Sequence, residues 1–271
     1  MTTPSEKRAR FRELHEAGCF VIPNPWDVGS ARMLQALGFP ALASTSSGFA
    51  WSTGRLDNEV PLADMLAHLA VLADATDLPL NADFENGYAD APEAVAANVR
   101  LALDAGVAGL SIEDMSRDSG KPLYEAALAV ERVKAARAAV DAEGSGAVLV
   151  ARAEGLLIGQ MDLRQTLDRL VLLAEAGADC LYAPGLRTAE DVAAAVGAVA
   201  PKPLNVLMWT KGLTVAELAD LGVRRISVGG ALARTAWAGF LGAAREIAIE
   251  GRFDRLGEAA TGAELKALLR P

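Results

Sequence analysis

One pattern recurs along the whole chain: a short apolar run, a polar or glycine-rich turn, and a longer alanine-rich amphipathic segment that ends in glycine. Short apolar runs between turn residues are typical of strands, and longer amphipathic segments are typical of helices. The pattern predicts strands at residues 20–23, 41–44, 78–82, 109–112, 148–151, 180–183, 204–207 and 225–228. It predicts helices between them, among them 27–37, 62–75, 91–105, 123–142, 161–176, 188–199, 214–221 and 231–249.

Four joints that lead from a predicted helix into the next strand have the same form. Each places a glycine where a helix would end in a left-handed residue, namely Gly38, Gly106, Gly177 and Gly222. Strands that are apolar on both faces and alternate with helices form a parallel sheet covered by helices. Eight such units predict one α/β domain, residues 1–271, folded as a (β/α)8 TIM-type barrel, with residues 251–271 as a C-terminal helical arm. An open, doubly wound sheet is the structural alternative.

The charge composition argues against two classes of binding partner. The 271 residues include 26 basic and 35 acidic side chains, a net charge of −9. Nucleic acids and anionic membrane surfaces are bound by clustered Lys and Arg, so neither is an expected partner.

Cys19 and Cys180 lie far apart in apolar runs, which predicts buried, reduced thiols. The first residues lack the apolar core of a signal peptide and no run approaches about 20 apolar residues, so a cytoplasmic protein is expected.

Charged side chains follow three neighbouring predicted strands, at the rim where barrel enzymes carry their chemistry. Asp83 and Glu85 follow the third strand, Glu113 ends the fourth, and Arg152 and Glu154 follow the fifth. Carboxylates that gather at one rim repel one another unless a cation or a proton lies among them, and oxygen ligands favour Mg²⁺ or Mn²⁺ over Zn²⁺. The alternative is that these acids only cap the following helices and solvate the loops.

Five segments, in matching order and spacing, make the chain resemble the isocitrate lyase and phosphoenolpyruvate mutase superfamily. In chain order they are Ser47-Gly48-Phe49, Asp57, Asp83-Phe84-Glu85-Asn86-Gly87-Tyr88, Ile112-Glu113-Asp114 and Ala151-Arg152-Ala153-Glu154-Gly155. The first resembles the superfamily's substrate loop after strand two, and the second is the acidic position that follows it. The third resembles its metal-binding segment, and the last two resemble the ends of strands four and five.

The resemblance implies a Mg²⁺ site, with Mn²⁺ as a possible substitute, near Asp83, Glu85 and Glu113 and mostly through water. It implies a small anionic 2-oxo or 2-hydroxy carboxylate as substrate, and a developing enolate that Mg²⁺ stabilises. The candidate catalytic residues are Asp57, Arg152 and Lys121, and the candidate substrate-binding residues are Thr45, Ser47, Gly48, Phe49, Arg152 and Asn205. The superfamily exchanges its last helix between subunits, and the apolar faces of residues 231–249 fit such a homo-oligomer, a dimer or a tetramer.

The chain departs from the lyase branch of the superfamily at three places. Isocitrate and methylisocitrate lyases carry a loop with Cys and His after strand four, and residues 114–122 have neither. The glutamate after strand six is missing, and Asn205 lies two residues before the usual strand-seven Asn. We therefore expect a Mg²⁺-dependent lyase or decarboxylase that cleaves a C–C bond in an alkylmalate or oxaloacetate rather than in isocitrate. The alternatives are P–C chemistry of the phosphoenolpyruvate mutase or phosphonopyruvate hydrolase type, and a catalytically silent barrel that only binds oxoacids.

Two segments have competing interpretations. Lys121 could gate the site or donate a proton, or the Lys121-Pro122 pair could simply begin the next helix. The glycine-rich turn at Gly229 and Gly230 after strand eight resembles the phosphate-binding turn of many barrels, which favours a phosphosugar isomerase-like alternative. The same glycines could only permit close packing at a tight turn.

Overall fold

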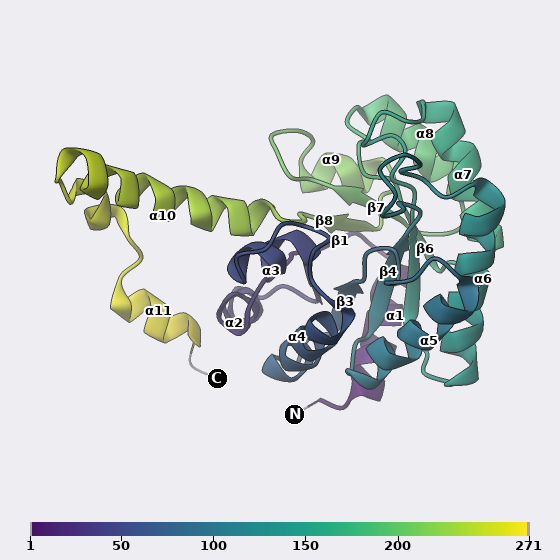
Figure 1. Cartoon of the computed structure of the whole chain (residues 1–271), viewed down its shortest axis with the longest axis horizontal. Coiled ribbons are helices and arrows are strands. Elements are labelled where there is room, and N and C mark those ends of the chain that lie inside the picture. Colours follow the sequence, from purple (N-terminus) through teal and green to yellow (C-terminus); the bar gives the residue numbers. More distant parts are fainter. Residues whose placement is uncertain (1, 270–271) are drawn as a thin grey trace.

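Eight short parallel strands form the centre of the molecule (Figure 1). The structure is a computed structural model that describes residues 2–269. The strands are β1 (Phe20–Ile22), β2 (Leu42–Ala43), β3 (Leu80–Asp83), β4 (Gly109–Glu113), β5 (Val148–Arg152), β6 (Cys180–Tyr182), β7 (Leu204–Leu207) and β8 (Arg225–Ser227). From β2 to β8 each strand pairs with the next, β8 also pairs with β1, and one backbone hydrogen bond of 3.0 Å from the Ala43 N–H to the Pro23 carbonyl joins β2 to the end of β1. This order confirms the predicted (β/α)8 barrel and excludes the doubly wound alternative.

The helices alternate with the strands and surround the sheet. They are α1 (Pro4–Glu16), α2 (Val28–Ala36), α3 (Ser46–Ser52), α4 (Leu62–Ala75), α5 (Pro92–Asp104), α6 (Ala126–Ala142), α7 (Leu163–Glu175), α8 (Ala189–Val199), α9 (Val215–Asp220), α10 (Ala231–Glu250), a 3₁₀ helix (Asp254–Glu258) and α11 (Gly262–Leu269). Every strand and helix predicted by residue range is present, with ends within about three residues of the expected ones. The four joint glycines have φ between 85° and 107°, so they are left-handed as predicted.

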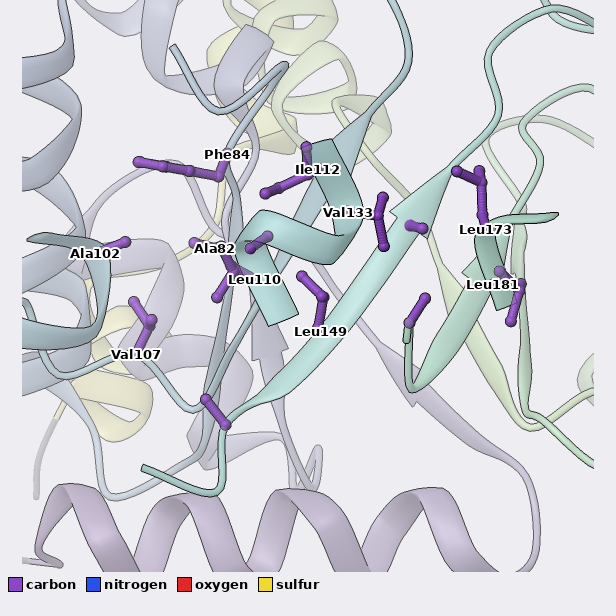
Figure 2. Close-up of a cluster of buried hydrophobic side chains, with 14 of the residues drawn as sticks. Ala82, Phe84, Ala102, Val107, Leu110, Ile112, Val133, Leu149, Leu173 and Leu181 are labelled. Carbon is purple, nitrogen blue, oxygen red and sulfur yellow. The ribbon is translucent and has the colours of Figure 1, made fainter. Parts of the chain in front are cut away.

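The side chains of each strand alternate between the surrounding helices and the barrel interior. Leu110 and Ile112 of β4 and Leu149 of β5 face outward, where they pack against helix residues such as Val133 and Leu173 (Figure 2). The alternate residues of these strands therefore face inward. This alternation brings the strand-end side chains Asp83, Glu113 and Arg152 to the same interior space.

Helix α1, which the sequence analysis did not predict, closes the opposite end of the barrel. A capping box starts it, because the Thr3 hydroxyl accepts from the Glu6 N–H and the Glu6 carboxylate accepts from the Thr3 N–H. Its Phe11 is fully buried in a cluster with interior residues of β1 and β5, including Phe20 and Val150. The closed end leaves the carboxyl ends of the strands as the open face of the barrel.

Helix α10 projects away from the barrel and begins a C-terminal arm (Figure 1). Within α10 only Ala233 is buried, whereas Phe240 and Ile249 are 59% and 80% exposed. After the 3₁₀ helix the chain turns back, and α11 packs against α2 (Figure 1). Of the helical arm predicted over residues 251–271, residues 270 and 271 lie outside the described part. Among residues 2–269, no helix combines the length and the apolar character that a membrane crossing requires.

Candidate active site

A cavity of about 480 Å³ opens at the carboxyl ends of the strands. Residues from most of the strand ends line it, and the lining combines charged and apolar side chains. The charged side of the lining includes Asp57, Asp83, Glu85, Glu113, Arg152 and Glu154, and its apolar side chains include Trp51, Met115, Leu157, Ile158, Leu207 and Trp209. The barrel fold thus gathers charged groups from three neighbouring strands, as the sequence predicts.

Arg152 is the centre of the charged side. Its Nη1 lies 2.7 Å from a carboxylate oxygen of Asp83 and 3.3 Å from one of Glu113, and its Nη2 lies 2.6 Å from Glu154. Its Nε donates to the same Glu154 oxygen at 2.8 Å, and its guanidinium lies over the Tyr182 ring. Burial by itself would lower the pKa of Arg152, but the three carboxylates outweigh it and raise that pKa. Arg152 therefore stays charged and is shared among three acids.

Asp83 is held from its other side by the segment that follows β2. Its second carboxylate oxygen accepts from the backbone N–H of Ser46 at 2.9 Å and from the Ser46 hydroxyl at 3.0 Å. The backbone N–H of Asp83 donates to the Ser44 hydroxyl at 2.8 Å. Both oxygens of Asp83 are thus oriented, which fixes this carboxylate at the edge of the cavity.

Glu85 is buried under a contact from the loop that joins β4 to α6. The Tyr88 hydroxyl donates to one Glu85 oxygen at 2.8 Å, and Arg117 from that loop pairs with the other at 2.7 Å. The Arg117 guanidinium also lies over the Tyr88 ring, 5.0 Å from its centre. Glu85 and Tyr88 have φ of 46° and 56°, a left-handed backbone that non-glycine residues seldom adopt outside constrained sites.

Negative charge exceeds positive charge around the cavity. Burial raises the pKa of Glu113 well above its usual range, Arg152 opposes this, and Glu154 and Asp83 add to it. Burial and the charge of Asp83 likewise raise the pKa of Glu85 and of Asp57, which faces the cavity although part of it is exposed to solvent. Carboxylates that resist ionisation in this way attract a proton or a cation.

The donor chemistry of this cluster fits a hydrated Mg²⁺. Four of its carboxylates, those of Asp57, Asp83, Glu85 and Glu113, line one cavity, and all their donor atoms are oxygen. Within residues 2–269, no three His, Cys, Asp or Glu side chains lie close enough to hold an ion directly between them. Mg²⁺ keeps several waters and takes only one or two carboxylates directly, so a site that works mostly through water needs no such group of three.

Several predicted site residues lie at the cavity and others do not. Thr45, Ser47, Asp57, Asp83, Glu85, Glu113 and Arg152 line it. The loop expected around Ser47 is instead helix α3, which is a correction to the sequence analysis. Its N-cap Thr45 accepts from the Gly48 N–H at 3.2 Å, and the Phe49 N–H donates to the Thr45 carbonyl at 3.0 Å. Gly48 and Phe49 therefore stand behind the cavity, with their N–H groups already bonded.

The two remaining candidates also lie outside the cavity lining. Lys121 is exposed on the β4–α6 loop, before α6 begins. Asn205 is fully buried between β6 and β8, where it accepts from Arg225 and donates to Ser227. The turn after β8 does line the cavity, but the N–H groups of Val228 and Gly229 both donate to Asn24, so they do not form a free phosphate nest.

Sequence reasoning missed some residues that the fold brings to the site. Ser46, which holds Asp83, lies just before the segment that was singled out. Asp114 was named as part of Ile112-Glu113-Asp114 but given no role; it accepts from the Glu154 N–H at 2.8 Å and pairs with Arg169 at 3.1 Å, so it anchors the chain beside Arg152. Arg225 in β8 reaches the cavity floor, and the only signal for it in the sequence is a charged residue inside a strand predicted to be buried.

Comparison with known proteins identifies the family. The phosphoenolpyruvate phosphomutase family model matches residues 11–248, nearly the whole barrel. The chain belongs to the phosphoenolpyruvate mutase/isocitrate lyase superfamily. An uncharacterised protein of Mycobacterium tuberculosis H37Rv is 34% identical over 223 residues, which cover 81% of each chain. The 2-methylisocitrate lyase of Escherichia coli K12 is 32% identical over 158 residues, which cover 56% of this chain and 53% of that enzyme.

Solved structures of superfamily members superpose on nearly the whole chain. A candidate lyase/mutase of Burkholderia cenocepacia J2315 is 46% identical with a TM-score of 0.93, covering 97% of this chain and 95% of that one. A 2,3-dimethylmalate lyase is 28% identical with a TM-score of 0.85, covering 99% and 95%. An oxaloacetate acetylhydrolase in complex with its product oxalate is 28% identical with a TM-score of 0.86, covering 98% and 95%. These relatives support a lyase or mutase class for this superfamily member.

Proposed function

We propose that the protein is a Mg²⁺-dependent lyase or decarboxylase that cleaves a C–C bond in a small 2-hydroxy or 2-oxo carboxylate. The observation that carries this proposal is the cluster of Asp83, Glu113 and Arg152 on one wall of the cavity, joined by contacts of 2.7 and 3.3 Å. A bound Mg²⁺ would supply a Lewis acid for the oxygen on C2 of the substrate. Asp83, Glu85 and Glu113 would hold it, mostly through water, and Mn²⁺ is a possible substitute.

Arg152 has the charge and the shape to bind the carboxylate of the substrate. A guanidinium can pair with a carboxylate through two parallel hydrogen bonds. Nη1 of Arg152 is now paired with Asp83 and Glu113, while Nε and Nη2 both face Glu154. We expect Glu154 to keep the planar guanidinium in place through Nε and Nη2, so that a substrate carboxylate that enters the cavity can replace Asp83 or Glu113 as the partner of Nη1.

The apolar side chains of the lining support an alkyl-substituted substrate. Leu157, Ile158, Leu207, Trp51 and Trp209 belong to the same lining as the charged side chains. Each buried methylene contributes about 0.8 kcal/mol of transfer free energy, so such a lining favours an alkylmalate over unsubstituted oxaloacetate. The name of the 2,3-dimethylmalate lyase is consistent with this preference.

Cleavage of an alkylmalate requires two proton movements. When the C2–C3 bond of 2,3-dimethylmalate breaks, the C2 hydroxyl loses its proton, C2 with its methyl group becomes the ketone carbon of pyruvate, and the electron pair of the bond remains on C3, which then takes a proton. Asp57 is the candidate for holding the first proton on its carboxylate, because burial raises its pKa and it lines the cavity. A water molecule is the expected source of the second, since residues 114–122 contain neither Cys nor His.

The proposal is tested by incubating the purified protein with Mg²⁺ and a panel of acids: 2,3-dimethylmalate, oxaloacetate, isocitrate, 2-methylisocitrate and phosphonopyruvate. We expect pyruvate from the alkylmalate or oxaloacetate, and no appreciable glyoxylate from isocitrate. The variant Glu113→Gln should be inactive, and Asp118→Asn on the exposed part of the β4–α6 loop should retain activity. A protein that binds these acids but converts none of them would contradict the proposal and support the catalytically silent alternative.

A second candidate function is cleavage or rearrangement of a P–C bond. The observation that favours it is the match of residues 11–248 to the phosphoenolpyruvate phosphomutase family. Release of phosphate from phosphonopyruvate, or its conversion to phosphoenolpyruvate, would select this function over C–C cleavage.

A further inference from the structure

The floor of the cavity contains a buried arginine. Arg225 of β8 is 2% exposed, and its side chain enters the barrel interior and lines the cavity below the rim. It lies two residues before Ser227, which also lines the cavity, so it is one interior layer, roughly 6.6 Å, deeper along the strand. Its Nη1 reaches Asn81, which is two residues before Asp83 on β3, so Arg225 lies one layer below Asp83.

The neighbours that bind Arg225 are neutral. Its Nε donates to the side-chain carbonyl of Asn205 at 2.8 Å, and its Nη1 donates to that of Asn81 at 3.3 Å. A guanidinium has five N–H donors, and these two bonds leave most of them available. Among the described residues no carboxylate lies within 4.0 Å of Arg225, although 11 such ion pairs occur elsewhere. Buried charges in proteins are normally paired, because leaving one unpaired costs several kcal/mol.

The titratable groups around Arg225 do not supply the missing negative charge. Burial raises the pKa of the Cys180 thiol to about 11 and raises that of Tyr182, so both are neutral near pH 7. Burial, with Arg225 itself, lowers the pKa of His15 to about 3, so this imidazole is also neutral. The remaining charged neighbour is Arg152, which is already paired with three carboxylates. Arg225 is therefore the cation that makes the lower part of the cavity attractive to an anion.

We propose that the cavity floor is an anion-binding subsite centred on Arg225, which takes a single carboxylate group or a small inorganic anion. Ala43 and Ser111, two small residues, belong to the same cavity lining as Arg225. A free anion and one carboxylate of a dicarboxylic acid both offer a negative charge and acceptor lone pairs. Either of the two could therefore be the ligand, and the experiment below separates them. The subsite does not depend on the proposed lyase activity.

The test measures stability, so it does not depend on turnover. Anything that binds only the folded state raises the melting temperature in a saturable way. The wild type, Arg225→Gln and Arg225→Lys are melted in a buffer of a bulky sulfonate, with sodium formate, chloride or malonate added at constant ionic strength. The matched control is Arg224→Gln, which removes the same charge from the neighbouring residue, whose side chain donates to the Gly18 carbonyl away from the cavity.

We expect formate to raise the melting temperature of the wild type and of Arg224→Gln alike, and to lose this effect in Arg225→Gln. Arg225→Lys keeps the charge but not the planar fork, so its apparent Kd for formate should rise about tenfold or more. If malonate still raises the melting temperature of Arg225→Gln, the subsite takes a free anion. If Arg225→Gln has also lost its response to malonate, the subsite takes one end of a dicarboxylate. An unchanged formate response in Arg225→Gln, or no response in the wild type to any of the three anions, would overturn the proposal. If Arg225→Gln does not fold, the Lys variant alone decides, because an unchanged Kd in it contradicts the subsite.

Discussion

Arg152→Lys tests whether the arginine at the centre of the cavity binds substrate or only neutralises its neighbours. Lysine keeps the positive charge but has one nitrogen in place of the fork that now contacts Asp83, Glu113 and Glu154 at 2.6–3.3 Å. A substrate carboxylate would lose one charge-assisted hydrogen bond, worth about 1.5–3 kcal/mol. Since about 1.4 kcal/mol is a factor of ten, kcat/KM should fall about 10- to 100-fold, mainly through KM.

The same substitution should also lower the free energy of unfolding. The Arg152 side chain is 16% exposed. The single nitrogen of Lys can pair with the acids at Nη1, Asp83 and Glu113, or with Glu154, but not with both groups. We expect a loss of about 1.5–3 kcal/mol, less than the ~3–5 kcal/mol that follows when one partner of a buried pair is removed outright. Stability is measured by urea unfolding, and kcat and KM by a coupled assay for pyruvate, in the same buffer.

Arg169→Lys is the matched control for this experiment. Arg169 is 8% exposed at its side chain and pairs with Asp114 at 3.1 Å, but it does not line the cavity. Its Lys variant should lose a similar amount of stability while KM stays unchanged. If Arg152→Lys behaves in the same way, with lowered stability and an unchanged KM, Arg152 is a structural counter-ion and its assignment as a substrate-binding residue is refuted.

Three further predictions concern the metal, the pH dependence and the arm. Asp83→Asn should abolish turnover and weaken Mn²⁺ binding, measured by electron paramagnetic resonance, while circular dichroism shows an intact fold. Burial raises the pKa of Asp114 from 3.8 to about 6, so its protonation stabilises the folded state below about pH 4, and this contribution is lost as the pH rises to 6. The free energy of unfolding measured with urea should therefore fall less between pH 4 and 6 in Asp114→Asn than in the wild type. In Asp168→Asn, on the surface of α7, it should fall as much as in the wild type. If the exposed face of α10 is exchanged between subunits, Phe240→Asp should reduce the molar mass found by light scattering, and a monomeric wild type would contradict this.

The parts of the site that sequence reasoning found are those set by strand parity. In a barrel, residues two apart along a strand share a face, and the end of each strand points to the same rim. Asp83, Glu113 and Arg152 occupy the last position of their strands, so their convergence follows once the strands are identified. Their pairing with one another could not be read from sequence, because side-chain contacts depend on the relative height of three separate strands.

The parts that sequence reasoning missed depend on short segments and on contacts distant in sequence. Helix α3 has only seven residues, three of them Ser and one Gly, so its intrinsic helix preference is weak, and tertiary packing decides its conformation. A side chain added at Gly48 would approach the Thr45 side chain to 2.6 Å and Ala233 to 3.3 Å, which shows how closely α3 packs against the start of α10. Asn205 was chosen by its similarity to a family position, but its amide is used to hold Arg225.

The distribution of charge within the barrel connects these observations. Acids dominate at the rim, where Asp57, Glu85 and Glu113 have raised pKa values, whereas the layer below contains Arg225 without a carboxylate partner. A cation is therefore favoured at the rim and an anion beneath it, and in a low-dielectric cavity each charge strengthens the attraction for the other. A small carboxylic acid that enters with a divalent cation would satisfy both layers together. On this argument metal and acid should bind with positive coupling, and Arg225→Gln should reduce that coupling without removing the metal site.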